Sequence, residues 1–246
     1  MKRLRIAWLR LTGCSGCQLS LLNAETELTV AAGHLELVAF PLVSSAAPDL
    51  HRIDVALVEG ALSTPDEMQT LLELRRRAPF LIATGACALS GGIPALAGDR
   101  RGERFSSVYG DGKSCTSFPP QAVHCFVSVD LEIPGCPPEP GELLNALASA
   151  TRGGLPETES APVCFECRQH ENLCLLFETS PHAACLGPLT RSGCAARCPS
   201  QGVPCEGCRG PVPEARTAEL LKLLEADGFA TRELHARLER FGGGSS

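Results

Sequence analysis

The stretch LTGCSGCQLS, residues 11–20, places Cys14 and Cys17 three positions apart, where a short apolar run ends and a helical pattern begins. The apolar run Leu4–Leu9 predicts a strand, and the segment after the pair predicts a helix that stops at Gly33. A Cys-x-x-Cys pair can form a disulfide, hold a zinc ion or hold an iron–sulfur cluster, and a cysteine that follows an export signal can carry a lipid. The rest of the sequence must decide between these chemistries.

Short apolar segments alternate with helical patterns through residues 1–152. The predicted strands are Leu4–Leu9, Leu35–Phe40, Ile53–Val58, Phe80–Thr84 and Val123–Val129. One helix is predicted to begin at the capping sequence Thr64-Pro65-Asp66-Glu67 and to end before Pro79, and another to cover Glu142–Ala150. This alternation is typical of an α/β fold, in which helices cover a mostly parallel sheet.

The composition describes a globular chain of 246 residues with a formal net charge of −6 and 14 cysteines. Acidic and basic residues are interspersed, which argues against a nucleic-acid partner. The apolar run before Cys14 contains Arg10 and is shorter than the roughly 7–15 residues of an export signal, which disfavours lipidation and export. No segment has the roughly 18 apolar residues of a membrane span, so direct membrane insertion is not expected. These features predict a cytoplasmic protein, in which many cysteines indicate metal or redox chemistry.

The chain divides into regions of different character. Residues 1–152 form the predicted sheet domain, and the segment 153–163, GGLPETESAPV, has the composition of a linker. Residues 163–212 form a Cys-rich domain with little apolar periodicity, so cross-links must hold it together. Residues 213–241 return to helical spacing and predict a helical tail that packs as a hairpin on its own domain, with docking onto a partner as the alternative.

Four cysteines follow predicted strands at the same edge of the sheet. Cys14 and Cys17 follow the first strand, Cys87 follows Phe80–Thr84, and Cys136 follows Val123–Val129. Because ligands of an open α/β sheet bind at the carboxyl ends of its strands, these thiols are expected to converge on one crevice. Flanking glycines favour an iron–sulfur cluster over a compact zinc ion, since a large anionic cluster needs close backbone approach. Zinc, a disulfide and a catalytic thiol pair remain as alternatives.

The Cys-rich domain holds eight cysteines, enough for two further sets of four ligands. They are Cys164, Cys167, Cys174, Cys185, Cys194, Cys198, Cys205 and Cys208. Two more clusters are predicted, with two zinc sites as the alternative, and three clusters in one chain predict an electron-transfer role. Cys115 and Cys125 are left over. Cys125 is expected to be a buried, inert thiol because it alternates with apolar residues.

Other polar residues near the cysteines are expected to play surface roles. The histidines considered as ligands are His51, His124, His170 and His182, and none is expected to bind metal because cysteines complete the sets. The charged residues between the cysteines are Glu166, Arg168, Arg191 and Arg197. They are predicted to form a solvated face, with local pairing that shapes a cluster's potential as the alternative.

Several motifs together resemble those of one family. They are GCSGCQLSLLN, IDVALVEGALSTPDE, FLIATGACALSGGIPAL, VDLEIPGCPP, PVCFECRQHENLCLL and CLGPLTRSGCAARCPSQGVPCEGCRGP. With them, nearly the whole chain is similar to the small, electron-transferring subunit of [NiFe] hydrogenases. The similarity is closest to soluble cytoplasmic members of the sulfhydrogenase or NAD(P)-linked type, followed by the non-cofactor-reducing hydrogenases of methanogens.

The resemblance implies a flavodoxin-like domain and three [4Fe–4S] clusters. The implied ligands are Cys14, Cys17, Cys87 and Cys136 for a proximal cluster, Cys194, Cys198, Cys205 and Cys208 for a medial one, and Cys164, Cys167, Cys174 and Cys185 for a distal one. Membrane-bound and periplasmic relatives commonly carry His at the position of Cys164 and a non-ligating residue at that of Cys198. This chain has Cys at both positions, and the resemblance therefore implies that all three clusters are of the [4Fe–4S] type. Those relatives also carry an acid where this chain has Gly13, so a proton route through that position lacks its acid here.

The resemblance also implies a division of labour between subunits. The nickel–iron centre belongs to a separate large subunit, so this chain is expected to have no catalytic residue and to act as the electron-transfer subunit of an oxidoreductase. The other implied partner is a flavin/NAD(P) subunit or another iron–sulfur electron-transfer subunit. The alternatives are a carrier of the respiratory complex I lineage, which characteristically has adjacent cysteines in place of Cys14-x-x-Cys17, and a zinc-stapled structural module.

Overall fold

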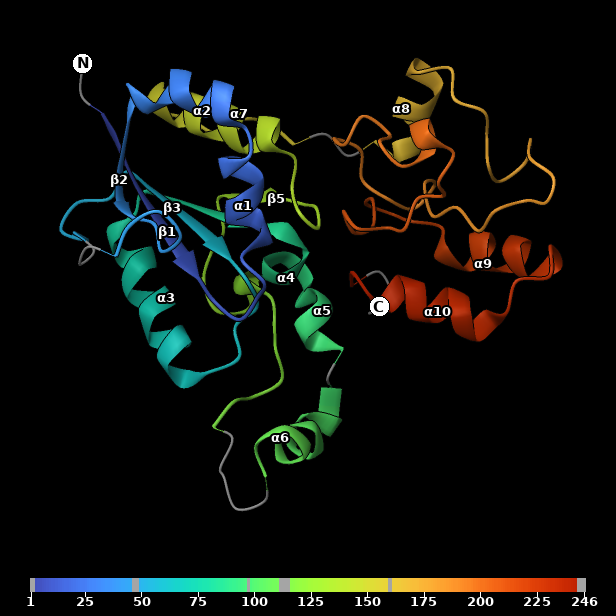
Figure 1. Ribbon diagram of the computed structural model, residues 1–246, viewed down its shortest axis with the longest axis horizontal. Helices are drawn as coiled ribbons and strands as arrows, with labels where there is room; N and C mark the ends of the chain where they lie inside the picture. The colour runs from blue at the N-terminus through green and yellow to red at the C-terminus, as the bar shows by residue number, and fades with distance from the viewer. Residues whose placement is uncertain (1–2, 46–48, 97, 111–115, 159–160, 243–246) are drawn as a thin grey trace. The chain divides into compact units, whose positions relative to one another are not determined.

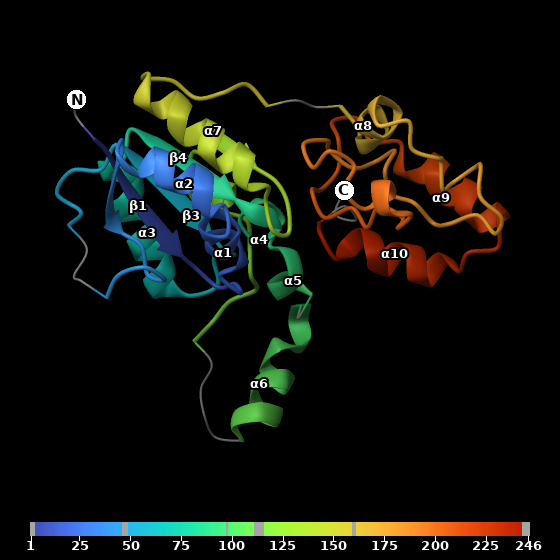
Figure 2. The ribbon, with the colours of Figure 1, turned by 45° about the horizontal axis from the view of Figure 1, so that its top comes forward.

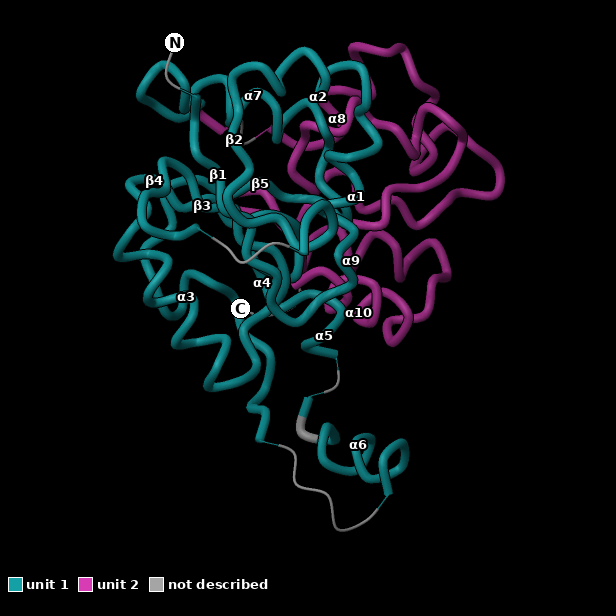
Figure 3. The backbone as a smooth tube through the Cα atoms, turned by 60° about the vertical axis from the view of Figure 1, so that its left-hand side comes forward, with its two compact units in different colours: residues 1–156 teal, residues 157–246 magenta. Residues whose placement is uncertain are grey.

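The computed structural model describes residues 3–45, 49–96, 98–110, 116–158 and 161–242. Cys115, one of the two cysteines left over from the predicted sets, lies outside these ranges. The chain forms two compact units, residues 1–156 and residues 157–246 (Figure 3). We refer to them as the sheet unit and the Cys-rich unit.

The sheet unit is built on parallel strands in the order β2-β1-β3-β4-β5. They are β1 (Leu4–Arg10), β2 (Leu35–Ala39), β3 (Val55–Glu59), β4 (Phe80–Thr84) and β5 (Leu131–Ile133). This order is that of flavodoxin-like folds and confirms the predicted α/β class. Because the strands are parallel, their carboxyl ends share one edge of the sheet.

Helices cover both faces of this sheet (Figures 1 and 2). The α-helices described in this unit are α1 (Gly16–Leu22), α2 (Glu25–Ala32), α3 (Pro65–Arg77), α4 (Gly85–Ser90), α5 (Gly92–Ala95), α6 (Arg101–Tyr109) and α7 (Pro140–Thr151). Of these, α6 extends away from the sheet in both views (Figures 1 and 2). On one face, Ile6 and Trp8 of β1 belong to the same buried cluster as Leu143 of α7. On the other face, Ala7 belongs to a cluster with Leu71 of α3. Alternate residues of β1 thus face opposite layers, and Trp8 is a core residue.

The best-marked predicted helix is confirmed at both of its ends. The Thr64 hydroxyl accepts a hydrogen bond from Glu67 N at 3.2 Å, and the Glu67 carboxylate accepts one from Thr64 N at 3.0 Å. This reciprocal capping satisfies backbone donors that the first helical turn leaves open. The helix, α3, ends at Arg77, before Pro79.

Three expectations about the sheet unit are wrong. The helix after Cys17 is divided, because α1 ends at Leu22 and α2 begins at Glu25. The predicted strand Val123–Val129 instead contains a 3-10 turn, Val123–Cys125, and the edge strand is β5. Val123 and Val127 are both buried, and the Val127 N–H donates to the Val123 carbonyl at 3.2 Å, as in a helical turn. Their spacing therefore arises from a turn, and it leaves Cys125 exposed rather than buried.

The Cys-rich unit has little regular structure before its C-terminal helices. Its elements are α8 (Val163–Gln169), a 3-10 turn (Pro199–Gln201), α9 (Thr217–Ala226) and α10 (Thr231–Glu239). Leu224 of α9 and Leu234 of α10 are fully buried in one cluster with Leu186 and Leu189 of the Cys-rich loops. The tail therefore forms the predicted hairpin and packs on its own unit. Among the described residues, no helix combines the length and apolarity that crossing a bilayer requires.

Candidate functional site

The carboxyl edge of the sheet carries four cysteines, which we name the Cys14 group: Cys14, Cys17, Cys87 and Cys136. Ser15, which lies between Cys14 and Cys17, is the N-cap residue of α1 and has a left-handed backbone with φ of 65°. Cys87 lies on α4, which begins where β4 ends. The Ala86 N–H donates to the Gly135 carbonyl at 2.8 Å, which joins the helix carrying Cys87 to the loop carrying Cys136.

The four thiols of the Cys14 group influence one another electrostatically. Burial raises the pKa of Cys17 far above its ordinary value, and Glu59, Cys87 and Cys14 add to the rise. Burial, followed by Cys136 and Cys14, raises the pKa of Cys87 to about 11. These mutual influences indicate that the four thiols lie near one another at the predicted edge. Among the described residues, however, no set of three or more Cys, His, Asp or Glu side chains is arranged to hold a metal ion, so the role of these cysteines as ligands stays a prediction. Loading with metal must replace protons on these thiols, because the thiolate is the form that binds.

Glycines keep the space around these sulfur atoms clear. A Cβ atom at Gly85 would collide with Cys17 Sγ, and Gly85 also has φ of +83°, which favours glycine. A Cβ at Gly16 would lie 3.2 Å from Cys14 Sγ. A Cβ at Gly92 would lie 2.9 Å from the Cys87 backbone. This close approach of backbone to sulfur, with an all-thiol donor set, fits an iron–sulfur cluster.

A buried carboxylate beside the Cys14 group was missed by the sequence reasoning. Glu59, the last residue of β3, is 2% exposed and accepts a hydrogen bond from Gln18 N at 3.1 Å. Its other oxygen accepts a hydrogen bond from the Gln18 side-chain amide. The sequence offered one clue to this residue, namely an acid placed directly after the apolar run Val55–Val58. An acid that is buried at such a position usually has a specific partner or role. The negative charge of Glu59 acts directly on the Cys17 thiol.

The first group in the Cys-rich unit, the Cys164 group, comprises Cys164, Cys167, Cys174 and Cys185. Burial raises the pKa of Cys164 to about 11, and Cys185, Cys167 and Cys174 all raise it further. A Cβ at Gly187 would lie 3.4 Å from both Cys164 Sγ and Cys185 Sγ. Two of the four sulfur atoms thus lie beside this glycine, and the assignment of all four as one ligand set stays a prediction.

The second group, the Cys194 group, comprises Cys194, Cys198, Cys205 and Cys208. Burial raises the pKa of Cys194 to about 11, and Glu166 and Cys208 also raise it. Burial raises the pKa of Cys205 to about 12, with smaller contributions from Cys185 and Cys208. Cys198 is exposed, and its place in this group rests on the sequence. The two groups adjoin, because the Cys205 N–H donates to Cys185 Sγ at 3.3 Å.

The charged residues between these cysteines are not all solvated. Glu166 is half-buried, and its carboxylate accepts hydrogen bonds from the loop around Cys194, so the predicted solvated face is wrong for this residue. Two of the histidines considered as ligands lie beside carboxylates instead: His124 Nδ1 is 3.6 Å from Glu132, and His182 Nδ1 is 3.2 Å from Asp227.

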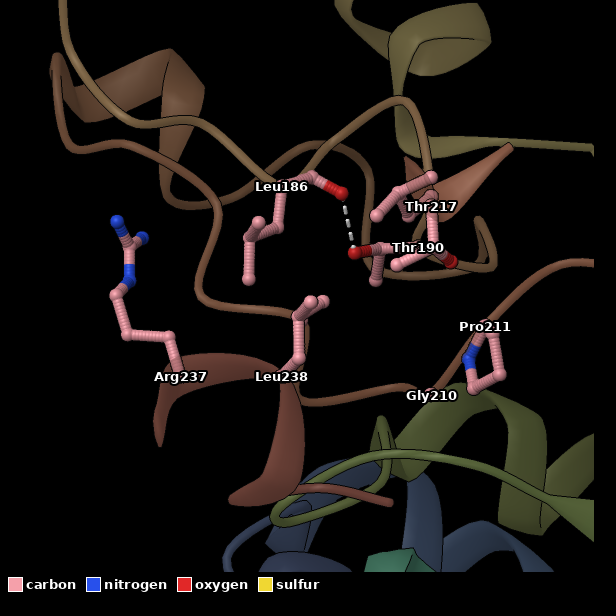
Figure 4. Close-up of a pocket in the computed structure, with 9 residues that line it drawn as sticks. Leu186, Thr190, Gly210, Pro211, Thr217, Arg237 and Leu238 are labelled. Carbon is pink, nitrogen blue, oxygen red and sulfur yellow. Dashed lines mark hydrogen bonds between the residues drawn. The ribbon is translucent and has the colours of Figure 1, made fainter. Parts of the chain in front are cut away.

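A small cavity lies where α10 meets the Cys-rich loops (Figure 4). Leu186, Thr190, Arg237 and Leu238 are among the residues that line it, and its volume of about 20 Å³ suits a single water molecule. The Arg237 guanidinium donates to the Cys205 carbonyl at 3.3 Å. The cavity is thus a packing gap beside the Cys194 group, too small for an organic cofactor.

The sequence matches the family described as NADH ubiquinone oxidoreductase, 20 Kd subunit, over residues 14–150. It is 35% identical to the delta subunit of sulfhydrogenase 2 from Pyrococcus furiosus, across 90% of this chain and 92% of that protein. It is 33% identical to a subunit of the F420-non-reducing hydrogenase vhu from Methanocaldococcus jannaschii, across 86% of this chain and 83% of that protein.

A comparison with solved structures also finds a hydrogenase chain. The chain aligns with a chain of the NAD⁺-reducing [NiFe]-hydrogenase in its H₂-reduced state with a TM-score of 0.55 and 29% identity, across 64% of this chain and 96% of that one. The family model, the curated relatives and the solved structure agree. The chain therefore belongs to the NADH ubiquinone oxidoreductase 20 Kd subunit family, and within it is a homologue of the small, electron-transfer subunits of [NiFe] hydrogenases.

Proposed function

We propose that this chain conducts electrons through three [4Fe–4S] clusters as the small subunit of a [NiFe] hydrogenase. A large subunit would contribute the nickel–iron centre, where H₂ is oxidised or protons are reduced. The observation that supports this function best is the gathering of the Cys14 group at the carboxyl edge of the sheet, in a member of this family. A [4Fe–4S] cluster accepts and releases single electrons when bound, and three of them provide successive redox sites.

The proposed ligand sets follow the three groups of cysteines. The Cys14 group would hold the proximal cluster, the Cys194 group the medial cluster and the Cys164 group the distal cluster. The mutual effects of the thiols within the Cys14 and Cys164 groups support these two sets. The proposed domains are residues 1–152 for the proximal cluster, residues 163–212 for the other two, and residues 213–241 for the tail.

The chain's own residues would hold the clusters and adjust their potentials. The Gly16 N–H donates to Cys14 Sγ at 3.4 Å, and the Cys205 N–H donates to Cys185 Sγ. Hydrogen bonds to sulfur stabilise the reduced cluster and raise its potential, whereas a nearby carboxylate such as Glu59 lowers it. Burial of Cys17 and Cys205 limits the access of water to these ligands.

The second proposed partner is a flavin/NAD(P) subunit or another iron–sulfur subunit that exchanges electrons with the distal cluster. The similarity to a chain of an NAD⁺-reducing hydrogenase and to a sulfhydrogenase subunit supports such a partner. The proposed location is the cytoplasm, where NAD(P) and many free thiols are found.

The test is metal and sulfide analysis of the chain, purified anaerobically with its partners, together with its visible and EPR spectra. About twelve iron and twelve acid-labile sulfide per chain, beyond the partners' share, would support three clusters. Stoichiometric zinc without labile sulfide or colour would contradict the proposal and leave a zinc-stapled structural module. About four iron per chain would leave only the proximal cluster.

A further inference from the structure

The carboxylate of Glu166 connects the two groups of cysteines in the Cys-rich unit. Glu166 lies on α8, the helix that carries two cysteines of the Cys164 group. Its Oε1 accepts a hydrogen bond from Gly193 N at 2.7 Å, and its Oε2 accepts one from Ala196 N at 3.1 Å. The thiol of Cys194, which lies between these two residues in the chain, is 3.8 Å from the same Oε2. A side chain on the helix that carries two cysteines of the Cys164 group therefore contacts the chain on both sides of Cys194, as well as the Cys194 thiol itself.

The loop that Glu166 binds has a backbone that needs support. Gly193, Ala195 and Ala196 have φ angles of 111°, 52° and 48°. Alanine adopts the left-handed region only at a cost in free energy, so surrounding interactions must hold Ala195 and Ala196 there. Such a backbone turns successive N–H groups toward one side and forms a concavity that binds anions. The carboxylate of Glu166 occupies the position of that anion.

We propose that Glu166 is a positioning residue for the Cys194 group, which holds residues 193–196 in the conformation that presents Cys194 to its cluster and fixes a negative charge beside that sulfur. The inference rests on the proposed function, because it requires a cluster at the Cys194 group. Reduction of a cluster adds negative charge, so a carboxylate at this place lowers the cluster's potential.

The experiment compares Glu166→Gln and Glu166→Ala with the unaltered chain, each purified anaerobically in the complex. Glu166→Gln keeps the size of the side chain and one accepting oxygen but removes the charge, whereas Glu166→Ala removes every contact with the loop. The measurements are iron content and an EPR-monitored redox titration. The matched control is Glu219→Gln, which removes an exposed carboxylate from α9 in the same unit.

We expect Glu166→Gln to retain its iron and to shift the midpoint potential of one cluster to a more positive value, with the other two unchanged. We expect Glu166→Ala to lose about a third of the chain's cluster iron, that of the Cys194 group. Unchanged potentials in the Gln variant together with full iron in the Ala variant would overturn the inference.

If the Gln variant also loses iron, hydrogen exchange of that variant distinguishes a local positioning role from general destabilisation of the Cys-rich unit. Faster exchange confined to residues 186–197 supports the positioning role, and equally fast exchange throughout the Cys-rich unit contradicts it. The unaltered chain separates this inference from the proposed function. Fewer than three reducible clusters in that chain would contradict the three-cluster proposal itself, whatever the variants show.

Discussion

Arg237 of α10 donates two hydrogen bonds to the carboxylate of Glu206, at 3.0 and 3.3 Å. Glu206 lies in the loop between Cys205 and Cys208, and the same guanidinium also contacts the Cys205 carbonyl. The C-terminal hairpin is thereby fastened to a loop that carries two proposed cluster ligands. Arg237 is 9% exposed, whereas the Glu206 side chain is 39% exposed, so water reaches the acidic side of this contact.

Replacing Arg237 with alanine should loosen this attachment. We expect a loss of about 1–2 kcal/mol in local stability, because a charged hydrogen-bonded pair is broken and a carbonyl loses its donor. Hydrogen exchange of α10 in the complex measures this loss. Arg240→Ala is the matched control, since Arg240 reaches the same Glu206 at 3.4 Å but is more exposed, and it should cost less than about 0.5 kcal/mol. Equal effects from both variants would refute the special role of Arg237.

Glu59→Gln should raise the potential of the cluster at the Cys14 group. The variant preserves the shape of the side chain and removes a buried negative charge beside Cys17, which corresponds to a shift of ~50 mV for a one-electron couple. EPR-monitored titration of the complex gives the shift. The control is Glu36→Gln, which removes a carboxylate near the amino ends of the strands, far along β2 from the cysteines. A potential unchanged in Glu59→Gln would show that the charge of Glu59 does not reach the cluster.

Gly85→Ala should prevent assembly of the cluster at the Cys14 group. The added methyl group would collide with Cys17 Sγ, and the φ of +83° is unfavourable for alanine. We expect the loss of about four iron per chain. Gly141→Ala in α7 is the control, because a Cβ there meets nothing within 4 Å, and its iron content should remain unchanged. Full iron in the Gly85 variant would mean that the loop can shift without affecting the ligands.

Cys136→Ser tests the proximal assignment by function. We expect the eight cysteines of the Cys-rich unit to retain their iron, while reduction of their clusters by H₂ falls at least about tenfold because the first electron site is damaged. Rapid-freeze EPR after mixing with H₂ follows this reduction. Cys125→Ser, which removes an exposed thiol outside the three groups, should leave the rate unchanged. A normal rate in the Cys136 variant would disprove its role as a ligand.

Thr64→Ala should destabilise α3 by about 1 kcal/mol, since the hydroxyl that caps the Glu67 N–H is lost. Hydrogen exchange of the first turn of α3 provides the measurement, with the exposed Gln69→Ala as the control. Iron content should be the same in both variants, because α3 itself carries none of the cysteines. A loss of iron in Thr64→Ala would link this helix to the cluster site.

Local signals in the sequence predicted much of the fold. The cap at Thr64 uses residues that are adjacent in the chain, so its chemistry is visible without tertiary structure. The segment Val123–Val129 shows the limit of such reasoning, because a valine spacing of four suits a helical turn as well as part of an alternating strand. Only the pairing of β5 with β4 determines which segment forms the edge of the sheet.

The candidate site was predictable where topology alone brings residues together. Because the strands are parallel, the segments that follow them meet at one edge of the sheet, and this places the Cys14 group there independently of the intervening side chains. The role of Glu166 was not predictable, because it depends on the left-handed backbone at Ala195 and Ala196, which propensity would not assign to alanine. The position of Glu59 at the end of an apolar strand was a local clue, but its partner Gln18 is distant in sequence.

The contact between Arg237 and the Cys205–Cys208 loop also bears on how the protein is made. A ribosome releases this loop before it releases α10, because synthesis proceeds from the N-terminus. While the chain is still growing, the Cys194 group lacks the hairpin that shields and fastens it. The proposed ligands in this loop are then more accessible than in the finished unit, in which α9 and α10 share one buried cluster with the Cys-rich loops.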